Sequence, residues 1–298
     1  MVDVDFLLDL LEDVREGEDV EREDVEKVNE VEEGEANSRV EDFRIRFPYA
    51  SYFIDILKLL KAFQGHYEDE VTFEVSDDGL KVQFMEPSRI ALIKFRLEPY
   101  AFEEFEAPAK ATRFTIGVKE LLKSLPKKMP RGSYAVLEAL EGKVRVRIYG
   151  AYGELISEAE PKLLEEENWT DLHLTPWTIL ATARLSLDDL YDAVRTVKGS
   201  SERVKIKVSH DMLVVERFDD ESKAKAIFVP NDPRLYELEV HQEAKVVLAV
   251  KYFENFLKYA RKLADEVKLM IATDKPLIAE AFIPSGELKF YQAPVVEC

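Results

Sequence analysis

The stretch from Val71 to Leu97 reads VTFEVSDDGLKVQFMEPSRIALIKFRL, and its pattern decides the fold class of the chain. Two runs rich in β-branched and aromatic residues, Val71–Val75 and Leu80–Met85, flank Asp77-Asp78-Gly79, a typical turn sequence of a β-hairpin. A third run of the same character, Ile90–Leu97, follows at once. The stretch therefore predicts three consecutive antiparallel strands.

Helix and strand signals surround this stretch in the first half of the chain. A strand is predicted at Asp42–Phe47 and a helix at Ala50–Phe63, where apolar residues recur every three to four positions. A helix at Gly117–Leu125 ends before a proline, which cannot continue it. A second hairpin runs from Tyr134 to Tyr149 and turns at Glu141-Gly142.

The second half of the chain repeats this order of elements. The predicted elements are strand Thr178–Leu185, helix Leu187–Val197, hairpin Val204–Arg217, strand Lys223–Val229, helix Val250–Ala264, and a hairpin through Pro284-Ser285-Gly286 to Tyr291. The helix at 187 begins with a capping-box pattern, Ser186-Leu187-Asp188-Asp189. Helix starts at 50 and 186 differ by 136 residues, and those at 117 and 250 by 133. We predict an α+β fold of two tandem copies, 42–163 and 177–298, joined by a linker at 164–176 and preceded by an extension at 1–41.

The composition indicates a soluble globular chain with an acidic balance. Its 298 residues are 46% hydrophobic, and 41 Lys+Arg against 60 Asp+Glu give a formal net charge of -19. No apolar run approaches the roughly 20 residues that span a bilayer, and the N-terminus is acidic where a signal peptide is basic. We expect a cytoplasmic protein, associated with the nucleoid, or a nuclear one in a eukaryote. Abundant Glu and Lys with scarce Asn and Gln indicate a heat-adapted source.

Residues 1–41 form a separate compositional block. They contain 17 Asp+Glu and 4 Lys+Arg, a net charge of -13, which leaves -6 for residues 42–298. Glu16–Glu41 is typical of solvated helix or disorder, whereas Val4–Val14 places apolar residues at helical spacing. This amphipathic stretch is either a terminal helix that frays or one that docks on its own chain or on a partner.

Lysine and arginine collect in the predicted helices, against the acidic trend. Four helix windows together hold 13 basic and 6 acidic residues, a net charge of +7, and the remainder of the chain carries -26. The windows are 50–63, 117–131, 186–199 and 250–263. In the last of them, Lys251, Lys258 and Lys262 fall within an arc of roughly 40°. Because chance gives no reason for this sign to recur in two repeats, we predict a surface that contacts phosphates without reading base sequence. We expect no base stacking, which needs interleaved aromatic residues.

Motifs of catalysis, nucleotide binding and metal binding are absent from the sequence. There is no phosphate-binding Gly-x-x-x-x-Gly-Lys-Ser/Thr loop and no Gly-x-Gly-x-x-Gly. The histidines lack the spacing of metal ligands, and Cys298 is the only cysteine. We predict a binding protein, not an enzyme, with no cofactor and no metal.

Two segments carry a family resemblance. DGLKVQFMEPSR at 78–89, followed by the strand at 90–97, resembles the signature region of DNA sliding clamps of the proliferating cell nuclear antigen (PCNA) family. LKFYQAPVVE at 288–297 resembles the closing strand and tail of the same family. With Thr115–Leu125, Val250–Leu257 and the duplicated order, the resemblance covers residues 42–298. It is of the archaeal type, and the acidic extension is not part of the family pattern.

The resemblance implies a ring of three subunits, a homotrimer or a heterotrimer, with sheets outside and helices lining a hole around duplex DNA. Such a ring is a processivity factor for DNA polymerase, and it also binds the clamp loader, flap nuclease and DNA ligase through short peptides. The resemblance implies that the following cations face DNA: Lys58, Lys61, Lys119, Lys123, Lys127, Lys128, Arg195, Lys198, Lys251, Lys258 and Lys262. Arg131 is a further candidate for such a contact.

Two further surfaces follow from the resemblance. The positions that match the hydrophobic pocket for partner peptides are Met85, Leu172, Leu174, Pro276, Tyr291, Ala293 and Pro294. The positions that match the subunit interface, where edge strands of neighbouring subunits pair, lie in Glu154–Glu160 and Ser222–Phe228. They include Glu154, Leu155, Ile156, Ser157, Lys223, Ala224, Lys225, Ala226 and Ile227. Such pairing buries edges that otherwise invite aggregation.

Three interpretations of function remain open at the level of sequence. The first is a general sliding clamp. The second is a specialised clamp, as one subunit of a heterotrimer or of a checkpoint ring, which the extension and the two tryptophans of the linker region, Trp169 and Trp177, motivate. The third is an acidic scaffold or DNA mimic that binds DNA-processing proteins and no DNA.

Overall fold

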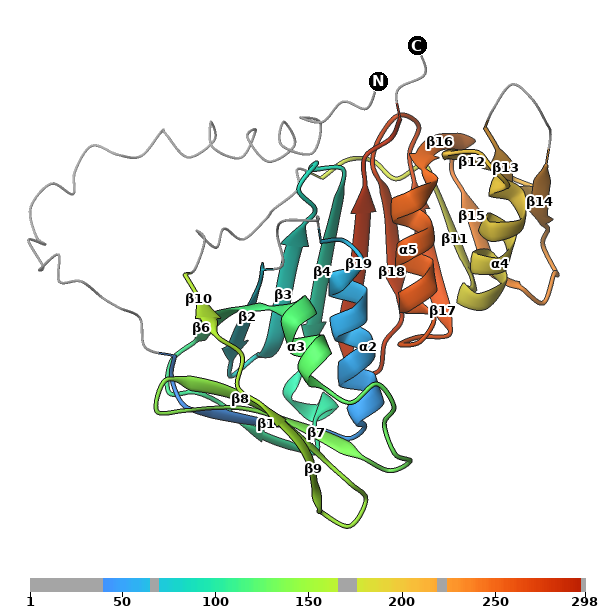
Figure 1. Cartoon of the computed structure of the whole chain (residues 1–298). Coiled ribbons are helices and arrows are strands. Elements are labelled where there is room, and N and C mark those ends of the chain that lie inside the picture. The colour runs from blue at the N-terminus through green and yellow to red at the C-terminus, as the bar shows by residue number, and fades with distance from the viewer. Residues whose placement is uncertain (1–39, 65–69, 166–175, 219–223, 296–298) are drawn as a thin grey trace, which may run out of the picture.

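The computed structural model describes residues 40–64, 70–165, 176–218 and 224–295 of the chain. Most of the predicted extension and most of the predicted linker therefore lie outside the described residues, and the domain boundaries stay predictions. In the described part, helices gather on one face of a set of antiparallel sheets (Figure 1). The predicted α+β fold class is confirmed.

The largest sheet runs through both halves of the chain. Its ten strands are, in spatial order, β10 (Leu163–Leu164), β6 (Thr112–Gly117), β2 (Glu70–Ser76), β3 (Gly79–Met85), β4 (Ala91–Leu97), β19 (Gly286–Gln292), β18 (Leu277–Ala281), β17 (Glu266–Ile271), β11 (Ala181–Ser186) and β15 (Leu235–Val240). The halves meet where β4 pairs antiparallel with β19, from Ala91 opposite Gln292 to Leu97 opposite Gly286. The predicted hairpin β2–β3 and its third strand β4 lie in this sheet, as expected from residues 71–97.

Two smaller sheets complete the two halves. The first contains β5 (Glu104–Glu106), β1 (Phe43–Phe47), β7 (Tyr134–Leu140), β8 (Lys143–Tyr149) and β9 (Leu155–Ala159), in that spatial order. The second contains β14 (Lys225–Phe228), β13 (Met212–Arg217), β12 (Arg203–Ser209) and β16 (Ala244–Ala249), again in spatial order. A short 3-10 helix, Pro99–Ala101, connects β4 to β5.

The strand order of the first copy recurs in the second. The first copy has β4-β3-β2-β6 and β5-β1-β7-β8-β9, and the second has β14-β13-β12-β16 and β15-β11-β17-β18-β19. In this correspondence β4 matches β14, and β9 matches β19. The two strands that join the copies inside the chain, β4 and β19, are thus the counterparts of β14 and β9, each of which ends a sheet of the described chain.

Four helices cover the sheets on one side. They are α2 (Ala50–Lys61), α3 (Val118–Ser124), α4 (Leu187–Lys198) and α5 (Val250–Ala260). Helix α2 packs between α3 and α5, and α5 packs against α4, so the helices form a row across both copies (Figure 1). The predicted cap of α4 is present, since the Asp189 backbone N–H donates to Ser186 Oγ at 3.2 Å. Helix α5 is shorter than predicted: it ends at Ala260, and Lys262 lies in the turn that follows.

Aromatic packing ties the helix row to the junction of the two copies. Phe290 of β19 is fully buried, and its ring centroid lies 4.7 Å from Phe256, 5.7 Å from Phe63 and 6.5 Å from Phe253. These partners come from α5 and from the end of α2, so one side chain contacts both copies.

We expect Phe290→Ala to lower the free energy of unfolding by about 3–5 kcal/mol, because it removes a buried ring and leaves a cavity among three other rings. Guanidinium unfolding followed by circular dichroism measures the change. The control is Phe282→Ala, where the ring is 47% exposed, with an expected loss below about 0.5 kcal/mol. Equal losses for the two variants would contradict the central role of Phe290.

Candidate nucleic-acid interface

The eleven cations predicted to face DNA all lie in the described residues, on the helices or directly after them. We call the surface formed by α2, α3, α4, α5 and residues 126–131 the helix face. Lys58 and Lys198 are half-buried, and the others are exposed, namely Lys61, Lys119, Lys123, Lys127, Lys128, Arg195, Lys251, Lys258 and Lys262. Arg131 is exposed as well.

The amphipathic pattern of the helices determines this exposure. In α5, Val250, Phe253, Phe256, Leu257 and Ala260 are buried against the sheet, so the lysines of the opposite side turn to solvent. Helix α2 buries seven apolar residues in the same way and leaves Lys58 and Lys61 at its last turn. There the lysines also complement the negative end of the helix dipole.

Four of the eleven cations form ion pairs with acidic side chains that the sequence interpretation had not included. Lys58 Nζ lies 3.0 Å and Lys262 Nζ 3.8 Å from Asp55 Oδ1. Lys123 pairs with Glu120 at 2.6 Å, and Lys198 pairs with Glu254 at 2.5 Å. Ion pairs at the protein surface contribute only about 0–1 kcal/mol, so phosphates can replace these carboxylates at small cost.

Tyrosine rings support several of the cations, which corrects the expectation of a face without interleaved aromatics. Lys258 and Lys262 lie 5.1 Å and 5.8 Å from the ring centroid of Tyr259. Lys251 lies 5.4 Å from Tyr252, and the guanidinium of Arg195 lies 5.5 Å from Tyr191. The tyrosine rings are half-buried or buried. Their cation–π contacts hold the lysine and arginine charges at the surface.

A cavity of about 310 Å³ opens in the middle of the helix face, between α2, α3 and α5. Its cations are Lys58, Lys61 and Lys127, and its apolar lining comes from Ile54, Ala62, Leu122, Pro126 and Tyr259. The site thus combines three positive charges with an apolar floor.

Five of the seven residues predicted to form the peptide pocket lie in the described part of the chain. Met85 and Ala293 pack with Ile90 and Tyr252 in a small apolar cluster separate from the main core. Pro276 and Pro294 are buried, and Tyr291 is half-buried, with its pKa raised by burial. Pro276 precedes β18, whose Leu277 lies opposite Gln292 of β19, so these residues share one end of the sheet. Leu172 and Leu174 lie outside the described residues.

Two buried polar residues beside this cluster were not predicted. Glu86 is 3% exposed, and burial followed by the charge of Glu86 raises the pKa of the neighbouring Tyr252 hydroxyl. Gln292 is fully buried, and its Nε2 donates to the backbone carbonyl of Ala249 at 2.9 Å. Both residues stand inside the segments that carry the resemblance, so their polarity among apolar neighbours was the available signal.

The predicted interface positions lie at the free edges of the two smaller sheets. On β9 and just before it, Glu154, Leu155 and Ile156 are exposed and Ser157 is half-buried. Near and on β14, Lys225 and Ile227 are exposed and Ala224 and Ala226 are half-buried, while Lys223 lies outside the described residues. Leu155 is 55%, Ile156 37% and Ile227 36% exposed, so each edge presents apolar side chains to solvent.

Comparison with known proteins agrees with this geometry. Residues 43–129 match the family model described as "Proliferating cell nuclear antigen, N-terminal domain". The DNA polymerase sliding clamp 1 of Pyrobaculum aerophilum is 26% identical over 248 residues, which are 83% of this chain and 94% of the relative. The DNA polymerase sliding clamp of Pyrococcus furiosus is 26% identical over 77% of this chain and 90% of the relative. The chain is thus similar to sliding clamps of the PCNA family, and its residues 43–129 match the model of their N-terminal domain.

Solved structures of this family share the fold. PCNA from Thermococcus kodakaraensis superposes with a TM-score of 0.76 at 24% identity, covering 85% of this chain and 100% of that chain. A PCNA2–PCNA3 complex from Sulfolobus tokodaii gives a TM-score of 0.75 at 22% identity, with the same two coverages. The match to the clamp family model begins at residue 43, so the acidic extension lies outside it.

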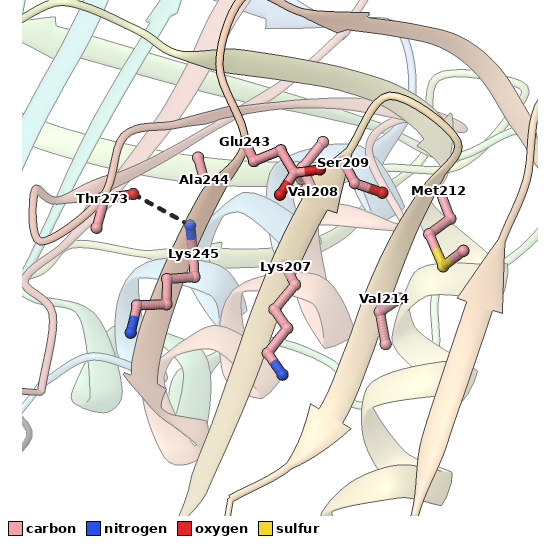
Figure 2. A pocket seen from close by; sticks show the side chains of 9 residues that line it. All are labelled: Lys207, Val208, Ser209, Met212, Val214, Glu243, Ala244, Lys245 and Thr273. Carbon is pink, nitrogen blue, oxygen red and sulfur yellow. Dashed lines mark hydrogen bonds between the residues drawn. The ribbon is translucent and has the colours of Figure 1, made fainter.

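A second cavity, of about 410 Å³, lies on the four-stranded sheet, where β12, β13 and β16 meet Thr273 (Figure 2). Lys207 and Lys245 stand directly opposite each other there, on neighbouring strands. Lys207 also pairs with Glu216 at 2.5 Å, and Glu243 lines the same cavity. This cavity was not predictable from the sequence, because β12 and β16, which form it, are about 35 residues apart.

Among the described residues, no group of three or more His, Cys, Asp or Glu side chains is arranged to hold a metal ion. In the same part of the chain, no helix is long and apolar enough to cross a membrane.

Proposed function

We propose that this chain forms a three-membered ring that encircles duplex DNA and keeps DNA polymerase on its template, as a sliding clamp without chemistry of its own. The observation that carries the proposal is the repeat correspondence of the strand edges. Strands β14 and β9 are the counterparts of β4 and β19, which pair inside the chain. Therefore β14 of one subunit can pair with β9 of the next subunit in the same way. Such a head-to-tail contact generates a closed ring when its rotation closes.

The charge distribution supports DNA as the molecule inside the ring. The cations collect on the helix face, while the chain as a whole has a net charge of -19, so a polyanion is attracted there and repelled elsewhere. Lysine contacts to phosphates carry no sequence information and are exchanged easily, which permits sliding. Topological closure then supplies the retention that these modest contacts lack.

Partner proteins are proposed to bind at the cluster of Met85, Ile90, Tyr252 and Ala293, next to Tyr291. The cluster lies at the sheet end near the last described residues, where Val295 N donates to the Val247 carbonyl at 2.8 Å. An extended peptide can add main-chain hydrogen bonds there and place an apolar side chain on the cluster. DNA polymerase, the clamp loader, flap nuclease and DNA ligase are the partner classes we propose.

The test of encirclement compares circular and linear DNA. The clamp is loaded on a nicked circular plasmid with a clamp loader, loading is scored by gel filtration, and the complex is then moved to about 0.5 M salt. We expect the clamp to stay on the uncut circle. After one restriction cut it should leave within minutes, because the cut removes the topological barrier and leaves the phosphate contacts unchanged. Loss from the uncut circle at the rate of the cut one would contradict the proposal.

A heterotrimeric ring is the second candidate, because one of the structural neighbours is a complex of two different PCNA chains. In that arrangement β14 and β9 of this chain pair with other clamp chains. The native mass of the isolated chain distinguishes the two cases, since only a homotrimer reaches three times 34.3 kDa alone.

A further inference from the structure

The cavity in the helix face has more positive charge than nearby acid balances, since of its three lysines only Lys58 forms an ion pair within the described residues, with Asp55. Lys61 and Lys127, which line it, are exposed and form no ion pair with another described residue. The neighbouring Lys128 and Lys258 are exposed and equally without an acidic partner among the described residues. When no DNA is present, this concentration of charge attracts any mobile anion of suitable shape.

The same chain carries the opposite charge in its first 39 residues. They contain 16 Asp+Glu and 4 Lys+Arg, a net charge of -12, so residues 40–298 carry only -7 of the total of -19. Within them, Phe6, Leu7, Leu10 and Leu11 stand among five acidic residues between Asp3 and Asp13. The segment therefore combines apolar side chains with negative charge, as the cavity combines an apolar lining with positive charge.

We propose that residues 1–39 bind the helix face of their own chain and compete there with DNA, with the apolar side chains near Phe6 and Leu10 seated in the cavity between α2, α3 and α5. The competition with DNA rests on the proposed function. The contact between segment and helix face does not.

Other hollows of the described surface fit this segment less well. A cavity of about 580 Å³ beside α3 is lined by Glu70, Glu120, Glu158 and Glu160 with a single cation, Lys162, so it repels an acidic peptide. The small apolar cluster at Met85 has Glu86 buried beside it, and the charges of Lys289, Glu287 and Glu280 act on the adjacent Tyr291, so this site offers no net positive charge to an acidic peptide. The cavity of Figure 2 has two lysines, of which Lys207 is already paired with Glu216, and Glu243 lines it as well. Charge complementarity therefore selects the helix face.

Tether length allows the contact within one chain. Val40 is 6% exposed, so the described structure anchors the segment there, and residues 15–39 lie between that anchor and the apolar stretch. An extended chain of 25 residues spans up to about 85 Å, whereas a compact chain of about 260 residues has a radius of gyration of about 18 Å. Short flexible tethers give effective concentrations in the millimolar range. A dissociation constant of about 100 µM for the separate peptide then suffices for about 90% occupancy.

The segment acts as a charge-matched plug of the site that DNA takes. If it occupies about 90% of free helix faces, it reduces apparent affinity for DNA about ten-fold, because only the unoccupied fraction is competent to bind. Since both contacts depend on charge, salt weakens both. DNA that has entered the ring displaces the segment, and the segment takes the face again when DNA leaves.

The experiment uses a variant that begins at Val40 and a fluorescent peptide of residues 1–39. We expect the peptide to bind the variant with a dissociation constant at or below about 100 µM at 50 mM salt, and to be released at 500 mM. The double substitution Lys61→Glu and Lys127→Glu in the truncated chain should weaken binding of the peptide at least ten-fold. The matched control, Lys110→Glu with Lys245→Glu, reverses two exposed lysines outside the helix face and should change the dissociation constant less than two-fold. A peptide with Asn and Gln in place of Asp and Glu should not bind.

Absence of binding at 50 mM salt, or equal effects of the two double variants, overturns the inference. Binding of a short duplex to the truncated and full chains is measured in parallel by anisotropy, with an expected gain of about ten-fold on truncation. Equal DNA affinity of the two chains overturns the competition and leaves the proposed function intact. If neither chain binds DNA, the proposed function fails, whereas the peptide result stands by itself.

Discussion

Reversing the charges of Lys61, Lys251 and Lys258 together is expected to weaken binding of duplex DNA by about 10²–10³-fold at 0.1 M salt. All three are exposed on α2 and α5 and form no ion pair with another described residue, so each is free to neutralise a phosphate. Each phosphate contact changes the slope of log affinity against log salt by about 0.9. Loss of three contacts therefore lowers the affinity of the variant at 0.1 M salt by about 2.7 log units, if the two proteins bind equally at 1 M salt. Anisotropy of a labelled duplex across a salt series measures both the affinity and the slope.

The matched control reverses Lys110, Lys245 and Lys275, three exposed lysines that lie outside the helix face. It changes the net charge of the chain by the same amount, and we expect less than a three-fold loss of affinity with an unchanged slope. An equal loss in both triple variants would show that DNA responds to total charge alone. The truncated chain that begins at Val40 repeats the comparison without the acidic segment.

Local signals made the repeating hairpins and helices predictable. Gly79 has a φ of +110°, and a Cβ there would stand 2.0 Å from the Leu97 carbonyl oxygen, so the Asp-Gly turn needs glycine. Glu141 and Gly142 have φ angles of 54° and 78°, the geometry of a tight two-residue hairpin turn. Ser186 caps α4 as its capping-box pattern indicates. Apart from the contact of Gly79 with Leu97, these features depend on neighbours within a few residues, which the sequence displays directly.

Two of the strands that the sequence did not predict, β5 and β15, depend on distant partners. Strand β15 pairs only with β11, more than 50 residues away, and β5 has three residues that pair with β1. No turn signal links either pair, so periodicity alone did not reveal them. The end of α5 was predicted too late because no glycine or proline follows Ala260 to mark it. Tertiary packing sets these boundaries.

The cations of the candidate site were predictable from amphipathic spacing, but their acidic partners were not. Asp55 is three residues from Lys58, whereas its second partner, Lys262, comes from the turn after α5 in the other copy. Only the packing of α2 against α5 brings that pair together. Glu86, directly after β3, and Gln292, at the end of β19, were missed for a related reason. A polar residue at the end of a strand is expected to be exposed until the segment that covers it is known.

Ile227→Asp is expected to stop ring assembly and leave the chain at its monomer mass of 34.3 kDa. Ile227 is 36% exposed on β14, the free edge that corresponds to β4, and the proposed head-to-tail contact buries it against β9 of the next subunit. An uncompensated charge in an apolar contact costs about 3–5 kcal/mol, which is about 10²–10³-fold in each junction constant. Sedimentation equilibrium measures the mass. Leu140→Asp, at a side chain 47% exposed on β7, is the control and should leave assembly unchanged.

Mixing two blocked variants tests the polarity of the contact. Leu155→Asp alters the β9 edge and should also yield a monomer, because every junction of a head-to-tail ring uses one β14 and one β9. The Ile227→Asp chain keeps an intact β9, and the Leu155→Asp chain keeps an intact β14. A mixture of the two can therefore form one junction, and we expect a dimer of one chain of each kind and nothing larger. An interface in which each edge paired with its own copy would instead allow each variant to dimerise alone through its unaltered edge. The mass of each variant by itself, set beside the mass of the mixture, thus decides between a polar ring contact and a symmetric one.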